Sequence, residues 1–250
     1  MSVLSVDTSR AAVARVALRS ADARNRLDDD TVAALLGALD DAESSPGAGV
    51  FVITAEGGTF CSGMPFADVE EADWPSRTAG LHRLFHRLRT SPLVTVAVVD
   101  GAALGGGVGL AAACDHVIAG TRARFRMTEV LLGLVPALIL PFVAHRVGAS
   151  RAVSLALTAT EVDGERAATL GLADTCALNP ERELRRILSR LHASDGDAVR
   201  ALKRYARALL GDPASDYPLA HEVLSTRLED PRLRRRLAGL AALAGSEGPA

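Results

Sequence analysis

Gly101-Ala-Ala-Leu-Gly-Gly-Gly-Val-Gly109 is the stretch that decides the fold, and only Asp100 separates it from residues 93–99, the most β-rich run of the chain. A glycine-dense turn between a strand and a helix lets the backbone approach a ligand closely, and the first helical N–H groups favour negative charge. Leu110 stands where a dinucleotide-binding G-x-G-x-x-G motif requires glycine, and Lys203 is the only lysine, so no P-loop is possible. The turn either donates N–H groups to a ligand or packs helix and strand tightly.

A second glycine turn, Gly57-Gly-Thr-Phe-Cys-Ser-Gly-Met64, follows residues 50–54, an apolar run with the length of a buried strand. Two such turns can each donate one N–H, and an oxyanion hole needs two donors. Each donor stabilises the developing oxyanion by roughly 3 to 4 kcal/mol. Cys61 or Ser62 can instead be a nucleophile, but Phe60 occupies a glycine position that the G-x-S-x-G elbow requires. We therefore favour an oxyanion hole.

Glu129 lies beyond the first glycine turn and is followed by the apolar residues Val130, Leu131 and Leu132. A carboxylate in such sequence is expected to be partly desolvated, which raises its pKa and suits a group that both takes and gives a proton. A helix-capping or surface glutamate is the alternative, and spacing alone favours it.

Composition limits the class of protein and its partners. The chain has 250 residues, 48% of them hydrophobic, which suits one domain or one domain with a helical appendage. A net charge of -2 gives no electrostatic reason to bind nucleic acid or an anionic membrane. Neither a signal peptide nor a membrane span is evident, so we expect a cytoplasmic protein. The three cysteines lack metal-ligand spacing, so we expect free thiols and no metal site.

Hydrophobic periodicity predicts alternating strands and helices followed by a helical final third. Residues 3–7 and 11–18 alternate around a turn at 8–10, which indicates a hairpin. Asp28 or Asp30 can cap a first amphipathic helix. The remaining expectations are a loop over 68–77, a helix over 81–88, a helix through 110–113, strands near 117–118 and 123–125, helix starts at Asn179-Pro180 and Asp230-Pro231, and a frayed tail over 245–250.

His82 and His86 lie four residues apart on the predicted helix, with Arg83 and Arg87 beside them. This cluster can hold an anionic substrate tail if it faces a pocket. The apolar residues of the same helix take the buried face, so a solvated basic face is the favoured interpretation.

Three motifs occur together: Phe60-Cys-Ser-Gly-Met64, the segment from Gly101 through Cys114-Asp115, and Thr128-Glu-Val-Leu-Leu-Gly-Leu-Val-Pro136. Their order and spacing resemble the crotonase (enoyl-CoA hydratase/isomerase) superfamily over nearly the whole chain. The resemblance implies an α/β fold, a crotonase-type spiral of repeated β-β-α units with a helical C-terminal region. It implies a spiral core over 1–194 and a helical region over 195–250 for a lid and for oligomerisation.

The resemblance also implies a site for an acyl thioester and its enolate. The two oxyanion donors correspond to the backbone N–H groups of Met64 and Gly106. The two glutamates of a hydratase correspond to Gly109 and Glu129, so only the second is present, which puts ordinary enoyl-CoA hydration in doubt. Pro65 replaces the aspartate that is common in the family directly after the first oxyanion donor, so we expect the start of the following helix to differ. Further residues expected at the substrate are Arg24 and Arg26 for the phosphate of phosphopantetheine, and Cys61, Ser62, His82, His86, Gly105 and Gly109.

The segment after Pro136, residues 137–148, resembles the first enoyl-CoA-hydratase-like enzymes of polyketide β-branching cassettes. That resemblance implies dehydration of a 3-hydroxy-3-methylglutaryl group on acyl carrier protein to a 3-methylglutaconyl thioester. It implies no cofactor beyond the phosphopantetheine arm of the carrier, and a homotrimer or hexamer. The alternatives are a CoA-dependent hydratase or isomerase, the β-branching decarboxylase, which relies on a pocket lysine, and a non-catalytic binding module.

Overall fold

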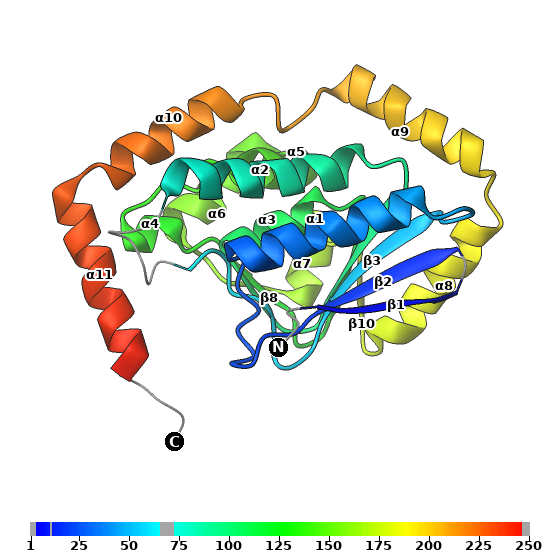
Figure 1. The fold of residues 1–250 in the computed structure, drawn as a ribbon, viewed down its shortest axis with the longest axis horizontal. Coiled ribbons are helices and arrows are strands. Elements are labelled where there is room, and N and C mark those ends of the chain that lie inside the picture. The colour runs from blue at the N-terminus through cyan, green and yellow to red at the C-terminus, as the bar shows by residue number, and fades with distance from the viewer. Residues whose placement is uncertain (1–3, 11, 66–72, 247–250) are drawn as a thin grey trace.

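The computed structural model describes residues 4–10, 12–65 and 73–246, which form two β-sheets surrounded by helices (Figure 1). The larger sheet has the strand order β1 (Leu4–Arg10), β2 (Val13–Leu18), β3 (Val50–Ala55), β5 (Val94–Val99), β7 (His116–Gly120), β10 (Thr175–Ala177). The smaller sheet has the order β4 (Thr59–Cys61), β6 (Ala102–Leu104), β8 (Arg124–Arg126), β9 (Val162–Asp163).

The two sheets are built by a repeating unit in which one strand enters each sheet before the chain continues to a helix. Strands β3, β5 and β7 pair in parallel in the larger sheet, while β4, β6 and β8 pair in parallel in the smaller one. Each repeat therefore advances the chain by one strand in both sheets, which produces a spiral. The predicted fold class, a spiral of β-β-α units with a helical C-terminal region, is confirmed.

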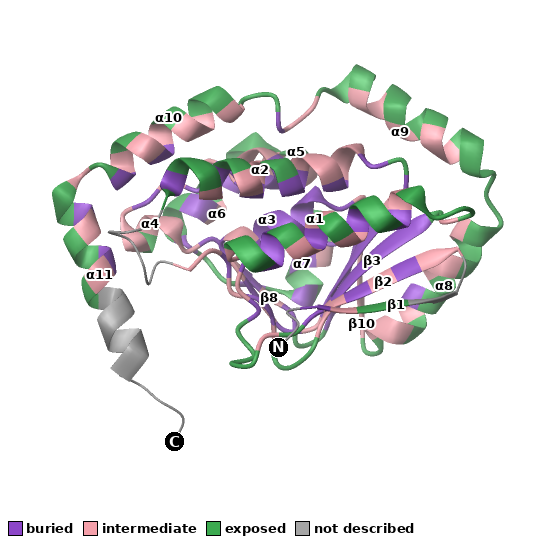
Figure 2. Cartoon of the chain, viewed as in Figure 1, coloured by how far each residue is buried: buried purple, intermediate pink, exposed green. Residues whose placement is uncertain are grey.

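Helices cover both faces of the larger sheet. The main core lies between this sheet and the helices from α1 to α7, and a smaller cluster packs α8 against the other face through Leu184 (Figure 2). The helices are α1 (Asp29–Ser44), α2 (Trp74–Thr90), α3 (Gly106–Ala113), α4 (Glu129–Leu132), α5 (Leu140–Val147), α6 (Ala149–Thr158), α7 (Gly164–Leu170), α8 (Pro180–His192), α9 (Gly196–Leu210), α10 (Tyr217–Leu228), α11 (Pro231–Ser246).

Several local predictions are confirmed and others are corrected. Asp28 caps α1 by accepting a hydrogen bond from the Thr31 amide at 2.8 Å. The hairpin exists, but β1 runs through the residues expected to form its turn, with an irregular register between Asp7 and Arg10. The loop expected over 68–77 is wrong at its end, because α2 already begins at Trp74; residues 68–72 lie outside the described residues. Helix α11 likewise continues into the expected tail as far as Ser246.

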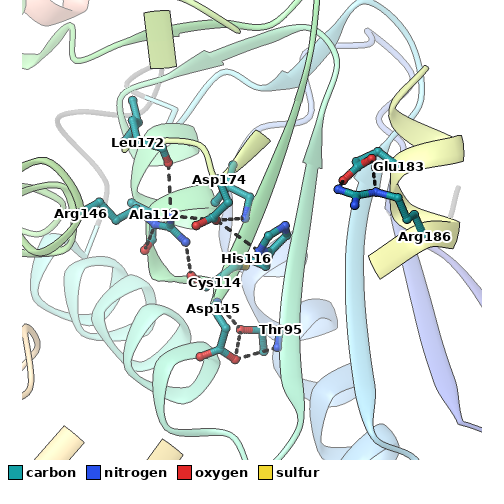
Figure 3. Close-up of polar contacts among 11 residues, drawn as sticks. Thr95, Ala112, Cys114, Asp115, His116, Arg146, Leu172, Asp174, Glu183 and Arg186 are labelled. Carbon is teal, nitrogen blue, oxygen red and sulfur yellow. Dashed lines mark hydrogen bonds and ion pairs between the residues drawn. The ribbon is translucent and has the colours of Figure 1, made fainter. Parts of the chain in front are cut away.

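Arg146 fixes the C-terminal end of α3, the helix that starts at the glycine turn (Figure 3). Its guanidinium donates to the carbonyl oxygens of Ala112 at 3.1 Å and Cys114 at 2.7 Å, and to Asp174 Oδ2 at 3.1 Å. The Arg146 side chain is only 9% exposed, so these bonds satisfy the last carbonyls of a buried helix. The C-terminal end of α3 is thereby anchored to α5 and to the segment before β10.

The only lysine anchors the C-terminal helices to the core. Lys203 of α9 donates to the Leu93 carbonyl oxygen and to Asp115 Oδ2, each at 2.5 Å. Asp115 also accepts from the Thr95 amide at 2.8 Å (Figure 3). Beyond α9, helix α10 packs on α2 and α11 packs on α10 and α4. Among the described helices, none is long and apolar enough to cross a membrane.

Candidate active site

The two glycine turns, α4 and α10 meet around a small, largely apolar pocket. Helix α2 contributes Leu81 and Phe85, and α10 contributes Leu224. Glu129 is the one ionisable side chain among the described residues that line it. The remaining lining residues are Ser62, Gly63, Met64, Gly105, Gly106, Thr128, Leu132, Leu134, Val135, Pro136, Ala137, Leu138 and Ile139.

The two glycine turns lie in direct contact with each other. A Cβ atom at Gly63 would lie 2.8 Å from the Leu104 carbonyl oxygen and 3.0 Å from the Gly106 nitrogen, and Gly63 has a φ of +82°. A Cβ atom at Gly107 would lie 2.2 Å from the Cys61 carbonyl oxygen. Glycine is therefore required at both positions by space, and at Gly63 also by conformation.

This contact brings two backbone amides together at the pocket. The position of a Cβ atom on Gly106 is 3.6 Å from the Met64 nitrogen. Gly106 is the first residue of α3, and neither its N–H nor that of Met64 donates a hydrogen bond to any described residue. Two unpaired amides beside a pocket, one of them at a helix N-terminus, can stabilise an oxyanion.

Glu129 begins α4 and places its carboxyl group against the first glycine turn. Its Oε1 atom lies 3.1 Å from the position of a Cβ atom on Gly105. Burial raises the pKa of Glu129 to about 7, partly offset by backbone hydrogen bonds to the carboxyl group. Its Oε2 atom is buried and has no hydrogen-bond partner among the described residues. A carboxyl group with these properties can exchange a proton near neutral pH.

The space beside Gly109 is occupied by hydrocarbon. A Cβ atom at this position would lie 2.4 Å from Ile139 Cγ2 and 3.1 Å from Phe85 Cε2. Ile139 and Phe85 are both almost fully buried. Apolar side chains therefore fill the space beside Gly109, and a carboxylate has no room there unless Ile139 moves.

The residues predicted around phosphopantetheine are only partly grouped. Arg24 is exposed, and Arg26 forms an ion pair with Asp22 at 2.5 Å. Ser62 lines the pocket, and its amide donates to the Arg24 carbonyl oxygen at 3.0 Å, which places this segment beside the second glycine turn. Cys61 is buried, and burial raises the pKa of its thiol to about 12, so it is unsuited to act as a nucleophile.

His82 and His86 are not brought to the pocket. The Nε2 atom of His82 lies 2.9 Å from the Ala214 carbonyl oxygen, and the His86 ring pairs with Asp212 at 3.2 Å. The ring of Tyr217 stacks on His82 at 4.1 Å between centroids. These histidines face α10 and the segment before it, while other residues of α2 face the pocket.

Ile139 and Leu224 are pocket residues that sequence reasoning missed. Ile139 lies in the segment after Pro136 that resembles the β-branching enzymes, and this resemblance was the only signal in the sequence that pointed to it. Leu224 comes from a helix far along the chain. An ordinary leucine on an amphipathic helix carries no local mark of a ligand contact.

The raised pKa of Glu129 predicts a pH-dependent stability. Because the folded state holds the proton more tightly than the unfolded chain, the stabilising contribution is complete below 4.5, the ordinary pKa of a glutamate, and is lost as pH rises through about 7. Glu129→Gln cannot ionise, so between these limits its unfolding free energy should gain up to about 3 kcal/mol on that of the wild type. Urea unfolding across this pH range measures the difference, and a constant difference would contradict the assignment.

The apolar wall predicts coupling between Gly109 and Ile139. Gly109→Ala should lower the unfolding free energy by about 1 to 3 kcal/mol, although alanine favours helix formation, because its Cβ atom overlaps Ile139. Adding Ile139→Ala should recover part of that loss. Gly80→Ala in α2 is the control, since its Cβ atom meets only Val32 at 3.6 Å. Purely additive costs in thermal or urea unfolding would refute this packing.

Comparisons with known proteins agree with this geometry. The family model for enoyl-CoA hydratase/isomerase matches residues 8–221. A Thermus thermophilus protein named as an enoyl-CoA hydratase is 38% identical over 178 residues, 69% of this chain and 70% of that protein. The bacillaene synthase dehydratase PksH of Bacillus subtilis is 29% identical over 207 residues, 80% of this chain and 79% of that one. The crystal structure of the Bacillus subtilis polyketide biosynthesis enoyl-CoA hydratase PksH aligns with a TM-score of 0.88 at 25% identity over 99% of both chains.

Proposed function

Because the chain belongs to the enoyl-CoA hydratase/isomerase family, we propose that it is a dehydratase that removes water from a β-hydroxyacyl thioester. Its relatives place it among hydro-lyase enzymes that act on acyl thioesters. The observation that carries the proposal is Glu129, the one carboxyl group among the described residues of a pocket in which Ile139 fills the space beside Gly109. Among the described residues, the pocket has no second carboxylate, so it cannot position a water molecule between two carboxylates as a hydratase does.

In the proposed mechanism, the thioester oxygen accepts hydrogen bonds from the amides of Met64 and Gly106. These bonds stabilise the enolate, so the α-carbon becomes more acidic. Glu129 removes the α-proton, the electron pair forms the α,β double bond, and the bond to the β-hydroxyl breaks. Glu129 then returns the same proton to the leaving hydroxyl, which departs as water. One carboxyl group therefore serves as base and acid in sequence on one face of the substrate.

The proposed substrate is a 3-hydroxy-3-methylglutaryl thioester on acyl carrier protein, with 3-methylglutaconyl thioester as product. Two observations support this substrate. The chain is similar to the bacillaene synthase dehydratase PksH, and its segment after Pro136 resembles the first enoyl-CoA-hydratase-like enzymes of polyketide β-branching cassettes. The phosphopantetheine arm is part of the carrier protein, so the proposed reaction needs no separate cofactor. Among the described residues, no group of three or more His, Cys, Asp or Glu is placed to hold a metal ion.

A homotrimer or hexamer is part of the proposal. Helix α9 has no buried residue, yet it exposes Leu202, Tyr205 and Leu209 along one side. Leu157 on α6 is 71% exposed. Apolar side chains at this density on the surface are typical of a contact between subunits.

Mass spectrometry of 3-hydroxy-3-methylglutaryl carrier protein incubated with the enzyme tests the proposal. We expect loss of one water without loss of carbon dioxide, and faster turnover than with the matched CoA thioester. Faster turnover of the CoA thioester would favour a CoA-dependent hydratase, and binding without turnover would favour a non-catalytic module. Loss of carbon dioxide would favour the decarboxylase, although Lys203 is bonded to Asp115 and does not line the pocket.

A further inference from the structure

Helix α11 has two chemically different faces. Leu233 and Leu237 are buried, and they pack in an apolar cluster with residues of α2, α10 and the segment after α4. Arg232, Arg235 and Arg236 are exposed on the remaining surface of the helix. In a chain with a net charge of -2, this is a local concentration of positive charge.

No described acidic side chain pairs with the arginines of this face. Arg232 and Arg235 make no side-chain hydrogen bond or ion pair with any described residue. The Arg236 guanidinium donates to the Leu131 carbonyl oxygen at 2.8 Å, a neutral partner. Asp230 lies 3.7 Å from Arg227 and accepts a hydrogen bond from the Arg232 amide rather than from its side chain. Among the described residues, the exposed face of α11 therefore carries positive charge without an acidic partner.

This face lies next to the pocket. Met64, whose amide has no partner among the described residues, packs against the same apolar cluster as Leu233 and Leu237. Arg236 bonds to the backbone of α4, the short helix that begins at Glu129, and α11 runs beside α4 in Figure 1. A helix with its side chains is about 10 Å across, so the arginine face lies roughly one helix width outside the pocket wall.

We propose that the exposed arginine face of α11, formed by Arg232, Arg235 and Arg236, is the docking surface for an acidic acyl carrier protein. This inference rests on the proposed function, because a carrier-bound thioester must bring its protein to the mouth of the pocket, whereas a CoA thioester brings none. Unpaired guanidinium groups attract an acidic protein surface over several ångströms and accelerate its encounter. The same attraction weakens as the salt concentration rises.

A paired charge reversal tests the docking surface. In Arg232→Glu/Arg235→Glu, we expect carrier-protein affinity, measured by surface plasmon resonance, to fall by about tenfold or more and to lose most of its salt dependence. The matched control is Arg182→Glu/Arg185→Glu, which reverses an exposed pair of the same spacing on α8, across the molecule in Figure 1. The control should bind the carrier like the wild type.

Turnover of the acyl group on pantetheine separates this inference from the proposed function. We expect kcat/KM for acyl pantetheine to stay within about twofold in both charge-reversal variants, because the pocket is unchanged. Unchanged carrier affinity in the α11 variant, or equal losses in both variants, would overturn the docking surface. If the wild type dehydrated neither the carrier-protein thioester nor acyl pantetheine, the proposed function would be refuted. The binding measurement would still decide whether the arginine face of α11 docks the carrier protein.

Discussion

Glu129→Gln is expected to lower kcat for dehydration by about three orders of magnitude while leaving the fold intact. The physical reason is that glutamine keeps the shape of the side chain but can neither remove the α-proton nor return it to the hydroxyl. No other ionisable side chain among the described pocket residues can replace it. Steady-state turnover of the β-hydroxyacyl thioester is the measurement.

The control for this variant is Glu161→Gln, which removes an exposed carboxyl group and should leave kcat unchanged. Thermal unfolding of Glu129→Gln at neutral pH should show no loss of stability, because the Oε2 atom of Glu129 is buried without a partner among the described residues. Turnover within tenfold of the wild type in a folded Glu129→Gln enzyme would contradict the proposed mechanism.

Gly106→Pro is expected to lower kcat by roughly 10² to 10³, because proline removes one of the two N–H donors to the thioester oxygen. Proline fits the first position of a helix, where its missing N–H breaks no helical hydrogen bond. Gly106 occupies that position in α3, and its amide is unpaired among the described residues. The loss should therefore come from the oxyanion site and not from unfolding.

Gly106→Ala is the matched control, since it adds carbon but keeps the N–H group. Its Cβ atom would meet Leu27 Cδ1 at 3.4 Å, a flexible side chain that can move aside. We expect Gly106→Ala to retain most of its turnover. Equal losses in the proline and alanine variants would indicate that crowding, and not the missing donor, explains the effect.

The parts of the fold that could be predicted are those with a strong local signal. The β-branched run that became β5 and the two glycine turns beside the pocket are marked by residue type alone. Periodic leucines and capping residues likewise indicated α1 and α8, whose caps are Asp28 and Asn179. Each of these signals depends on neighbours within a few positions, which is why sequence reasoning could find them.

The remaining features depend on contacts between distant segments. Strands β4 and β6 span three residues each, too few for alternation to distinguish them from turns. Leu224 reaches the pocket only because α10 packs on α2, and His82 points away from the pocket for the same reason. That Ile139 fills the space beside Gly109 follows from packing and not from either residue's neighbours in sequence.

The pH dependence of kcat/KM for dehydration tests the central claim most directly, namely that one carboxyl group with a pKa of about 7 serves as both base and acid. In the free enzyme the base must be ionised, so kcat/KM should rise with pH through a single ionisation near 7 and then stay level. A bell-shaped profile would require a second titrating group, and a flat profile between pH 5 and pH 9, roughly two units either side of that pKa, would exclude Glu129 as the base. Either result would contradict the single-carboxylate account.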